Sequence, residues 1–221
     1  MRCGRTGRVS RGWEEYLTPV MVLSARFEDA LVYANVVHRN QRRKSTQIPY
    51  VSHLLGVASI VLEFGGDEDE AIAALLHDAR EDQGGERELE QIRSRFGDRV
   101  AAIVAGCSDD MPEDPKHKLP WPERKATYQE HIRSTTDRSV LLVSAADKLH
   151  NARATLYDLR RHGPSVWSRF KAGRDASLWN YRSLIDAYSS HSSDGRVSGV
   201  VNELRRVVEE LSSDGGASSG D

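Results

Sequence analysis

Apolar residues recur along most of this chain at intervals of three and four positions, the spacing of one face of an α-helix. The first such stripe consists of Phe27, Ala30, Leu31, Ala34 and Val37. Ser24 precedes it as a candidate N-cap, because its hydroxyl can accept a hydrogen bond from the first turn. Runs of β-branched residues with the alternation of a strand are scarce. The pattern therefore predicts an all-α fold.

The same periodicity places a series of helices along the chain. We expect them at about 24–39, 50–64, 68–82, 86–96, 98–107, 123–134, 138–161, 174–190 and 197–211. Asp67 and Asp137 are the expected N-caps of two of them. Residues 71–76 are apolar on every side, so the helix that contains them should be the most buried one. Loops are expected at 40–49, which is polar and basic, and at 108–122, which is rich in proline.

The length of 221 residues fits one domain with tails. We expect a flexible basic N-terminal tail at 1–22, one helical domain at 23–192, a C-terminal helix at 193–212 and a disordered tail at 213–221.

Composition and charge narrow the classes of partner and the compartment. The formal net charge of -2 gives no global basic field, which argues against a nucleic-acid partner. No apolar stretch approaches the roughly 20 residues needed to span a bilayer, so we expect no membrane partner. The chain has two cysteines, and Cys3 lies in the expected tail. A disulfide framework is therefore not expected, and the sequence favours a cytoplasmic location.

The end of the most buried helix carries an unusual density of titratable residues. His77, Asp78, Glu81 and Asp82 directly follow the apolar run. In a continuous helix, His77 and Glu81 share one face, and Asp78 and Asp82 share the next. Burying such groups together is costly unless they are paired or bind a metal. A His-Asp pair by itself is common by chance and equally fits a solvated helix end.

Two further segments favour the metal interpretation. His53 lies near the start of one apolar helix, and Asp147 lies inside another, after the apolar run 140–143. Aspartate is rarely buried without a partner. Two histidines and two carboxylates suit a divalent ion such as Mn²⁺, Fe²⁺ or Zn²⁺.

Four ordered motifs together resemble a known family. The first combines HRNQRRK at 38–44 with PYVSH at 49–53, the second is LLHDARED at 75–82, and the third is ADKLHNAR at 146–153. The fourth and weakest combines Arg169-Phe170 with LWNYR at 178–182. The order His53, His77-Asp78, Asp147 resembles the HD superfamily of metal-dependent phosphohydrolases. The similarity is closer to the hydrolase domain of RelA/SpoT enzymes and to their free-standing small relatives, which degrade the alarmone (p)ppGpp.

The resemblance implies an HD-domain helical bundle of about 8 to 10 helices and a role for each matching residue. It implies that the metal ligands are His53, His77, Asp78 and Asp147. It implies that Glu81 and Asp82 are the catalytic carboxylates, which position water or shuttle its proton. It implies that Arg43 and Lys44 form a basic loop on the base and phosphates, and that Tyr50 and Asn151 make further nucleotide contacts. His38 matches the motif but is expected to be a structural histidine at a helix end.

The implied enzyme is a hydrolase without a synthetase domain, a monomer or homodimer, with Mn²⁺ as its cofactor and a small anionic nucleotide as its substrate. The expected reaction converts (p)ppGpp to GDP or GTP and pyrophosphate.

Several positions depart from the family pattern and leave the base and phosphate preference open. Arg80 replaces a small apolar residue, and Ala154 stands where a nucleotide-contacting threonine is common. The alternatives are hydrolysis of adenosine alarmones or of the 2′-phosphate of NADPH. A different class of alternative is a non-catalytic regulatory module, such as the neutralising half of a toxin–antitoxin pair.

Overall fold

The computed structural model describes residues 22–108, 119–191 and 193–213, and it confirms the all-α prediction. Within these residues the α-helices are α1 (Ala25–Val37), α2 (Val51–Glu63), α3 (Glu68–Leu76), α4 (Gly85–Phe96), α5 (Asp98–Cys107), α6 (Trp121–Ser134), α7 (Arg138–His162), α8 (Gly173–Ser189) and α9 (Gly195–Ser213). Most of the two predicted tails, and residues 109–118 of the predicted proline-rich loop, lie outside the described residues. None of the described helices has the length and apolarity needed to cross a membrane.

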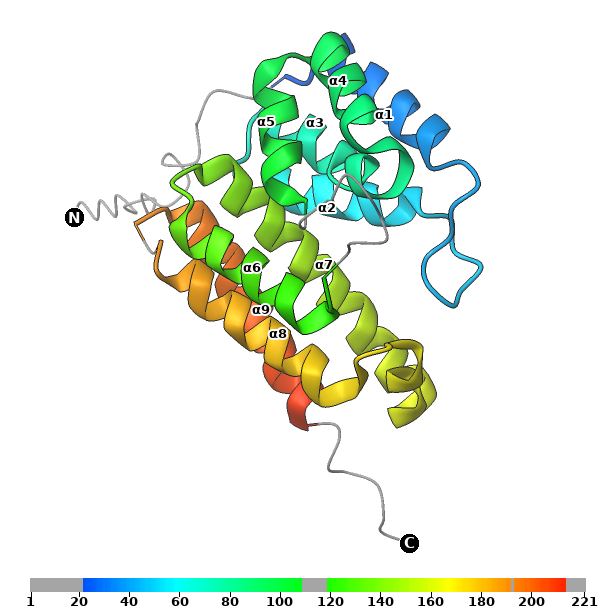
Figure 1. Cartoon of the computed structure of the whole chain (residues 1–221), viewed down its shortest axis with the longest axis vertical. Helices are drawn as coiled ribbons and strands as arrows, with labels where there is room; N and C mark the ends of the chain where they lie inside the picture. Colours follow the sequence, from blue (N-terminus) through cyan, green and yellow to red (C-terminus); the bar gives the residue numbers. More distant parts are fainter. Residues whose placement is uncertain (1–21, 109–118, 192, 214–221) are drawn as a thin grey trace, which may run out of the picture.

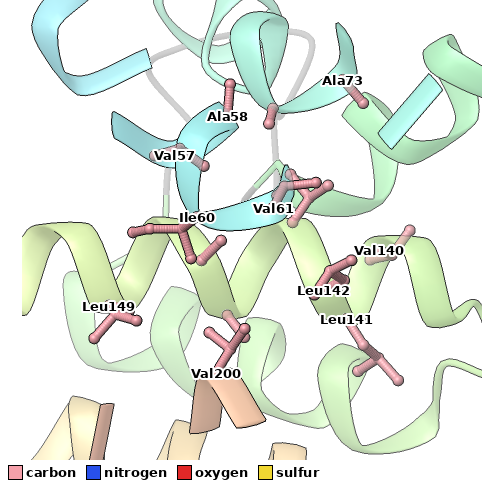
Figure 2. Close-up of a cluster of buried hydrophobic side chains, with 14 of the residues drawn as sticks. Val57, Ala58, Ile60, Val61, Ala73, Val140, Leu141, Leu142, Leu149 and Val200 are labelled. Atoms are coloured by element: carbon pink, nitrogen blue, oxygen red, sulfur yellow. The ribbon is translucent and has the colours of Figure 1, made fainter. Parts of the chain in front are cut away.

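The long helix α7 runs through the middle of the molecule. Figure 1 shows α1 to α5 gathered on one side of it and α6, α8 and α9 on the other. The apolar run 71–76 of α3 is fully buried, as predicted. Figure 2 shows α7 running between the two sides, with Val61 of α2 above it and Val200 of α9 below it, and its own Leu142 and Leu149 in the same cluster of buried side chains. The core is therefore continuous through both sides of α7.

Side-chain caps define three helix starts at the residues that the sequence predicts. The Ser24 hydroxyl accepts a hydrogen bond from the backbone N–H of Arg26, and the Asp137 carboxylate accepts from the N–H groups of Ser139 and Val140. Asp67 forms a reciprocal capping box with Glu70. Each cap satisfies backbone donors that the first helical turn leaves unpaired.

The segment after α3 differs from the continuous helix that the sequence suggested. The α-helix ends at Leu76, His77 is its C-cap, and a π-helix follows at Arg80–Gly84. The backbone N–H of Asp82 still donates to the carbonyl of Asp78 at 2.9 Å, as the predicted spacing requires, and the wider turn is closed by the N–H of Gly85 on the carbonyl of Arg80. The segment continues into α4 at Gly85 instead of breaking there. π-turns inside helical segments occur often at functional sites.

Backbone hydrogen bonds join the two ends of the loop between α1 and α2. An isolated bridge joins Arg42 to Pro49, and the backbone N–H of Tyr50 donates to the carbonyl of Gln41 at 3.1 Å. The N–H of Arg43 donates to the carbonyl of Ile48 at 2.9 Å. These bonds fix the basic residues of the loop beside the start of α2.

Candidate metal centre and substrate pocket

Three buried ligand-type residues from three helical segments meet at one point. His53 is in the first turn of α2, His77 is at the end of α3, and Asp147 is in the middle of α7. Each offers one ligand atom, and these atoms all lie within 4.8 Å of one another. The residues are between 1% and 7% exposed, so the group lies inside the core and not on a solvated helix end.

Asp78 completes the group that the sequence predicted. Its Oδ2 lies 3.0 Å from Nε2 of His77 and 3.5 Å from Nε2 of His53. Oδ1 of Asp147 faces the same two nitrogens at 3.6 and 3.2 Å. Two imidazole nitrogens and two carboxylates from α2, α3 and α7 thus converge.

The donor set fits a divalent metal ion. Nδ1 of His77 donates to the carbonyl of Ala74 at 2.8 Å, which directs Nε2 at the carboxylates. This Nε2 is buried and, among the described residues, forms no hydrogen bond, although carboxylate oxygens face it at 3.0 and 3.6 Å, so a cation between these atoms would satisfy all of them. Two imidazoles with carboxylate oxygens are a common ligand set for borderline divalent ions. The group of His53, His77 and Asp147 could therefore hold a metal.

The charges of the group depend on one another. Burial opposes ionisation of Asp78, but His77 and His53 outweigh it and hold the pKa of this carboxyl well below its ordinary value. Burial likewise opposes ionisation of Asp147, and Lys148, whose Nζ lies 2.5 Å from Oδ2, lowers the pKa of that carboxyl. Both carboxylates are therefore ionised and available as ligands.

His150 is a functional neighbour that sequence analysis missed. Its Nδ1 lies 2.9 Å from Nδ1 of His53, on the side of that ring opposite the carboxylates. Burial, together with the neighbouring charges of His53 and Arg43, lowers the pKa of His150 to about 4. The neutral ring can hold His53 through this contact, as partners of metal-binding histidines commonly do. The sequence offered one indirect signal, a glycine at position 56 inside a predicted helix; in the structure a Cβ atom there would lie 2.2 Å from Cδ2 of His150.

A cavity of about 500 Å³ lies beside the metal-binding group. Tyr50 and Asn151 line it and also contact the group: the Tyr50 hydroxyl donates to Asp78 at 2.6 Å, and the Asn151 amide donates to Asp147 at 2.5 Å. Burial and the adjacent Asp78 raise the pKa of Tyr50, so its hydroxyl stays a donor.

The cavity has cationic and aromatic walls. The structure brings the predicted substrate residues together there, because Arg43 donates to the side chain of Asn151 at 2.7 Å and also lines the cavity. The Lys44 ammonium lies 5.8 Å from the ring centre of Phe170. Arg169 and Lys148 also line the cavity, paired with Asp158 and Asp147 respectively, and Asp158 belongs to the lining as well. Such walls suit an anionic ligand with a flat ring.

The two predicted catalytic carboxylates lie on the π-helix that follows the metal ligands. Glu81 is half-buried, and Asp82 is exposed at the surface. Nε2 of Gln41 donates to Oδ2 of Asp82 at 2.7 Å, a contact that sequence analysis did not anticipate. Although the residue as a whole is exposed, partial burial of its carboxyl group raises the pKa of Asp82, and the charge of Asp78 adds to this.

Comparison with known proteins places this geometry in a family. A family model described as the HD domain matches residues 30–177, which is more than half of the chain. The chain is 40% identical over 143 residues to a guanosine-3′,5′-bis(diphosphate) 3′-pyrophosphohydrolase, MESH1, of Xenopus tropicalis, covering 63% of this chain and 73% of that protein. It is 40% identical over 139 residues to MESH1 of Danio rerio, covering 62% and 70%.

A solved structure leads to the same family. It is that of a metazoan ortholog of SpoT reported to hydrolyse ppGpp, and it superposes with a TM-score of 0.67 and 30% identity. The superposition covers 85% of this chain and 97% of the other. Together, the matched segment, the helical architecture and the shared sequence show that this chain belongs to the HD-domain family.

Proposed function

We propose that this chain is a metal-dependent hydrolase that removes the 3′-pyrophosphate of guanosine tetra- and pentaphosphate, giving GDP or GTP and pyrophosphate. The observation that supports this best is the juxtaposition of two imidazoles and two carboxylates with a cavity that has cationic walls. The names of the MESH1 relatives add to it, since each describes this reaction.

We infer that the metal is Mn²⁺, with Fe²⁺ or Zn²⁺ as alternatives, held by His53, His77, Asp78 and Asp147. When bound, such an ion lowers the pKa of a coordinated water and polarises a phosphoryl oxygen. Nε2 of His77 is buried and forms no hydrogen bond within the part of the chain that the structure describes, and this observation supports the ligand set.

We assign the remaining chemistry to side chains around this group. Glu81 and Asp82 orient the attacking water and accept its proton, a role that the raised pKa of Asp82 favours. Arg43 and Lys44 bind the base and its phosphates, because a guanidinium can both stack on a ring and pair with an anion. Tyr50 and Asn151 contact the nucleotide from the side of the cavity nearest the metal ligands.

The test is turnover of ppGpp by the purified protein with and without Mn²⁺, with released pyrophosphate and orthophosphate measured separately. We expect Mn²⁺-dependent release of pyrophosphate and GDP, and loss of turnover in Asp78→Ala. Adenosine alarmones and NADPH belong in the same panel, because Ala154 alters the cavity lining relative to the family pattern. Turnover of one of these with ppGpp left intact would refute the substrate assignment. Binding of ppGpp without any turnover would instead favour a non-catalytic regulatory or antitoxin role.

We further propose a cytoplasmic location and a monomeric or homodimeric state. Cys107, the cysteine within the described residues, is a free thiol, which supports a reducing compartment. Size-exclusion chromatography with light scattering tests the oligomeric state.

A further inference from the structure

We propose that Gln41 is a positioning residue that holds the Asp82 carboxylate in place, and that His38 fixes the orientation of the Gln41 amide. The inference rests on the proposed function, in which Asp82 acts on the attacking water. Four side chains from three segments carry it. They are His38 at the end of α1, Gln41 in the following loop, and Asp82 and Gln83 on the π-helix.

The carboxylate determines the direction of every hydrogen bond in this group. An ionised carboxylate only accepts, so the amide group 2.7 Å from Oδ2 of Asp82 must be the NH₂ end of Gln41. The carbonyl end, Oε1, then faces the other way. It lies 2.7 Å from Nδ1 of His38 and 2.6 Å from Nε2 of Gln83, and both must donate to it. His38 therefore carries its proton on Nδ1. If the Gln41 amide rotated by half a turn, its NH₂ group would face the N–H donors of His38 and Gln83.

His38 is itself held rigidly. It is 2% exposed, and its ring stacks on Tyr50 with 5.2 Å between the ring centres. The backbone of Gln41 is fixed from both sides, by donation to the carbonyl of His38 at 3.0 Å and by acceptance from the N–H of Tyr50 at 3.1 Å. The buried His38 ring and the hydrogen-bonded backbone of Gln41 thus hold the Gln41 amide as a donor to Asp82, which is otherwise exposed.

Asp82 needs such support because its surroundings offer little else. It lies on a π-turn, and Gln41 is the only side chain among the described residues that donates a hydrogen bond to it. A side chain that must accept a proton in a fixed direction gains from a rotamer locked by a neighbour. The arrangement also explains why a histidine that binds no metal lies in this motif: its Nδ1–H keeps the Gln41 amide from turning.

The test compares four variants by steady-state kinetics with ppGpp and saturating Mn²⁺. Gln41→Ala removes the donor, and Gln41→Glu replaces it with a group of the same shape that repels Asp82. We expect kcat to fall about 10-fold in Gln41→Ala and about 100-fold in Gln41→Glu, within the range for positioning and proton-transfer effects. KM and the affinity for Mn²⁺ should stay within about threefold of the values of the unaltered protein. His38→Phe keeps the stack on Tyr50 but loses the donor and should lower kcat, whereas His38→Asn, with an amide N–H in place of Nδ1–H, should restore most of it.

Two controls separate positioning from general damage. Gln47→Ala changes an exposed glutamine of the same loop and should leave kcat unchanged. The double variant Gln41→Ala/His38→Phe should be no slower than Gln41→Ala alone, because His38 acts through Gln41. Full activity of Gln41→Ala, or independent losses from the two sites, would overturn the proposal.

A measurement without substrate distinguishes this proposal from the proposed function. Urea unfolding of Gln41→Ala, Asp82→Ala and the double variant gives the coupling between the two side chains. We expect about a fivefold effect on the unfolding equilibrium constant, the size of one hydrogen bond. If ppGpp is not hydrolysed but the coupling is present, the proposed function fails and the Gln41–Asp82 contact stands. If the two substitutions are additive, the contact itself is refuted.

Discussion

At the scale of single residues, the site depends on which nitrogen of each histidine carries a proton. His77 donates through Nδ1 to a backbone carbonyl, so its Nε2 is the atom that could bind a metal. His53 contacts His150 through Nδ1 and faces the carboxylates through Nε2. His38 is the contrasting case, because its Nδ1 faces an amide oxygen and its buried Nε2 forms no hydrogen bond with any described residue. The neighbours of each histidine thus determine its role: a candidate metal ligand, a residue that orients such a ligand, or a residue that orients an amide.

Replacing Asp147 by asparagine should abolish tight Mn²⁺ binding. The change removes one of the two ligand charges and leaves the Lys148 ammonium, 2.5 Å away, without its counter-charge. We expect Mn²⁺ affinity and kcat each to fall by about 100-fold or more. Titration calorimetry with Mn²⁺ measures the first effect. Asp175→Asn, at an aspartate 95% exposed on α8, is the matched control and should bind Mn²⁺ normally.

The pH dependence of kcat should report Asp82. A general base must be ionised, so activity is lost as pH falls through its pKa. Burial and the charge of Asp78 raise that pKa, so the acid limb should lie above the ordinary aspartate value of about 4. Profiles must be recorded at saturating Mn²⁺, because protons otherwise compete for the ligand histidines. An acid limb at or below the ordinary aspartate value would argue against Asp82 as the base.

At the scale of helices, the sequence predicted starts and apolar faces well, because these features are local. Ser24, Asp67 and Asp137 cap the helices that they were expected to cap. The π-helix at 80–84 was missed because its residues fit an α-helical pattern equally well over so short a stretch.

Contacts between segments were predicted less well than the helices themselves. The meeting of His53 and His77 with Asp147 was anticipated from the expected burial of ligand-type residues and from the family motifs, since periodicity alone cannot say which helices approach each other. Gln41 and His150 lie inside the motifs, but no role was assigned to them, and their contacts with Asp82 and His53 became visible only with the packing known.

Helices α2 and α7 approach closely where Gly56 meets His150. Because of this contact, we expect Gly56→Ala to lower the free energy of unfolding when His150 is present and to raise it when His150 is replaced by alanine. In the unaltered protein, Gly56→Ala places a methyl group 2.2 Å from the His150 ring and should cost about 1–3 kcal/mol. In a His150→Ala background the clash is gone, and the same change should stabilise α2 by about 0.5–1 kcal/mol through helix propensity. Urea unfolding of the four proteins measures both. Equal effects in the two backgrounds would refute the contact.

The start of α9 is fastened to α3 by a buried ion pair. Arg196 lies 2.9 Å from Glu70, which is 1% exposed and also belongs to the capping box of α3. Removing the guanidinium in Arg196→Ala leaves a buried carboxylate without its cation, so we expect a loss of about 2–4 kcal/mol in the free energy of unfolding. Arg206→Ala breaks an exposed pair with Glu203 and should cost less than about 1 kcal/mol. Comparable losses in the two variants would contradict this account.

At the scale of the whole molecule, α7 links the chemistry to the remainder of the fold. It contributes Asp147 and Asn151 to the site, while its other face packs against α9. Figure 2 shows Val200 of α9 beneath the α7 side chains that also contact α2. Although the family match ends at residue 177, the packing continues beyond it. We therefore predict that α9 belongs to the same folding unit as the helices that carry the metal ligands.

Deleting α9 tests this prediction directly. Its buried face consists of Val197, Val200, Val201, Leu204, Val207, Val208 and Leu211. Each such side chain contributes roughly 1.5–3 kcal/mol on burial, so their joint loss is comparable with the 5–15 kcal/mol that stabilises a typical domain. We expect a chain ending at residue 194 to lose cooperative unfolding and Mn²⁺-dependent turnover together, as judged by circular dichroism and product release. Removing only residues 214–221 is the control and should change neither. A shortened chain that unfolds cooperatively and still releases pyrophosphate would contradict this prediction. In that chain the α9-facing side of α7 would be exposed to water, and α1 to α8 alone would have to hold Asp147 in place.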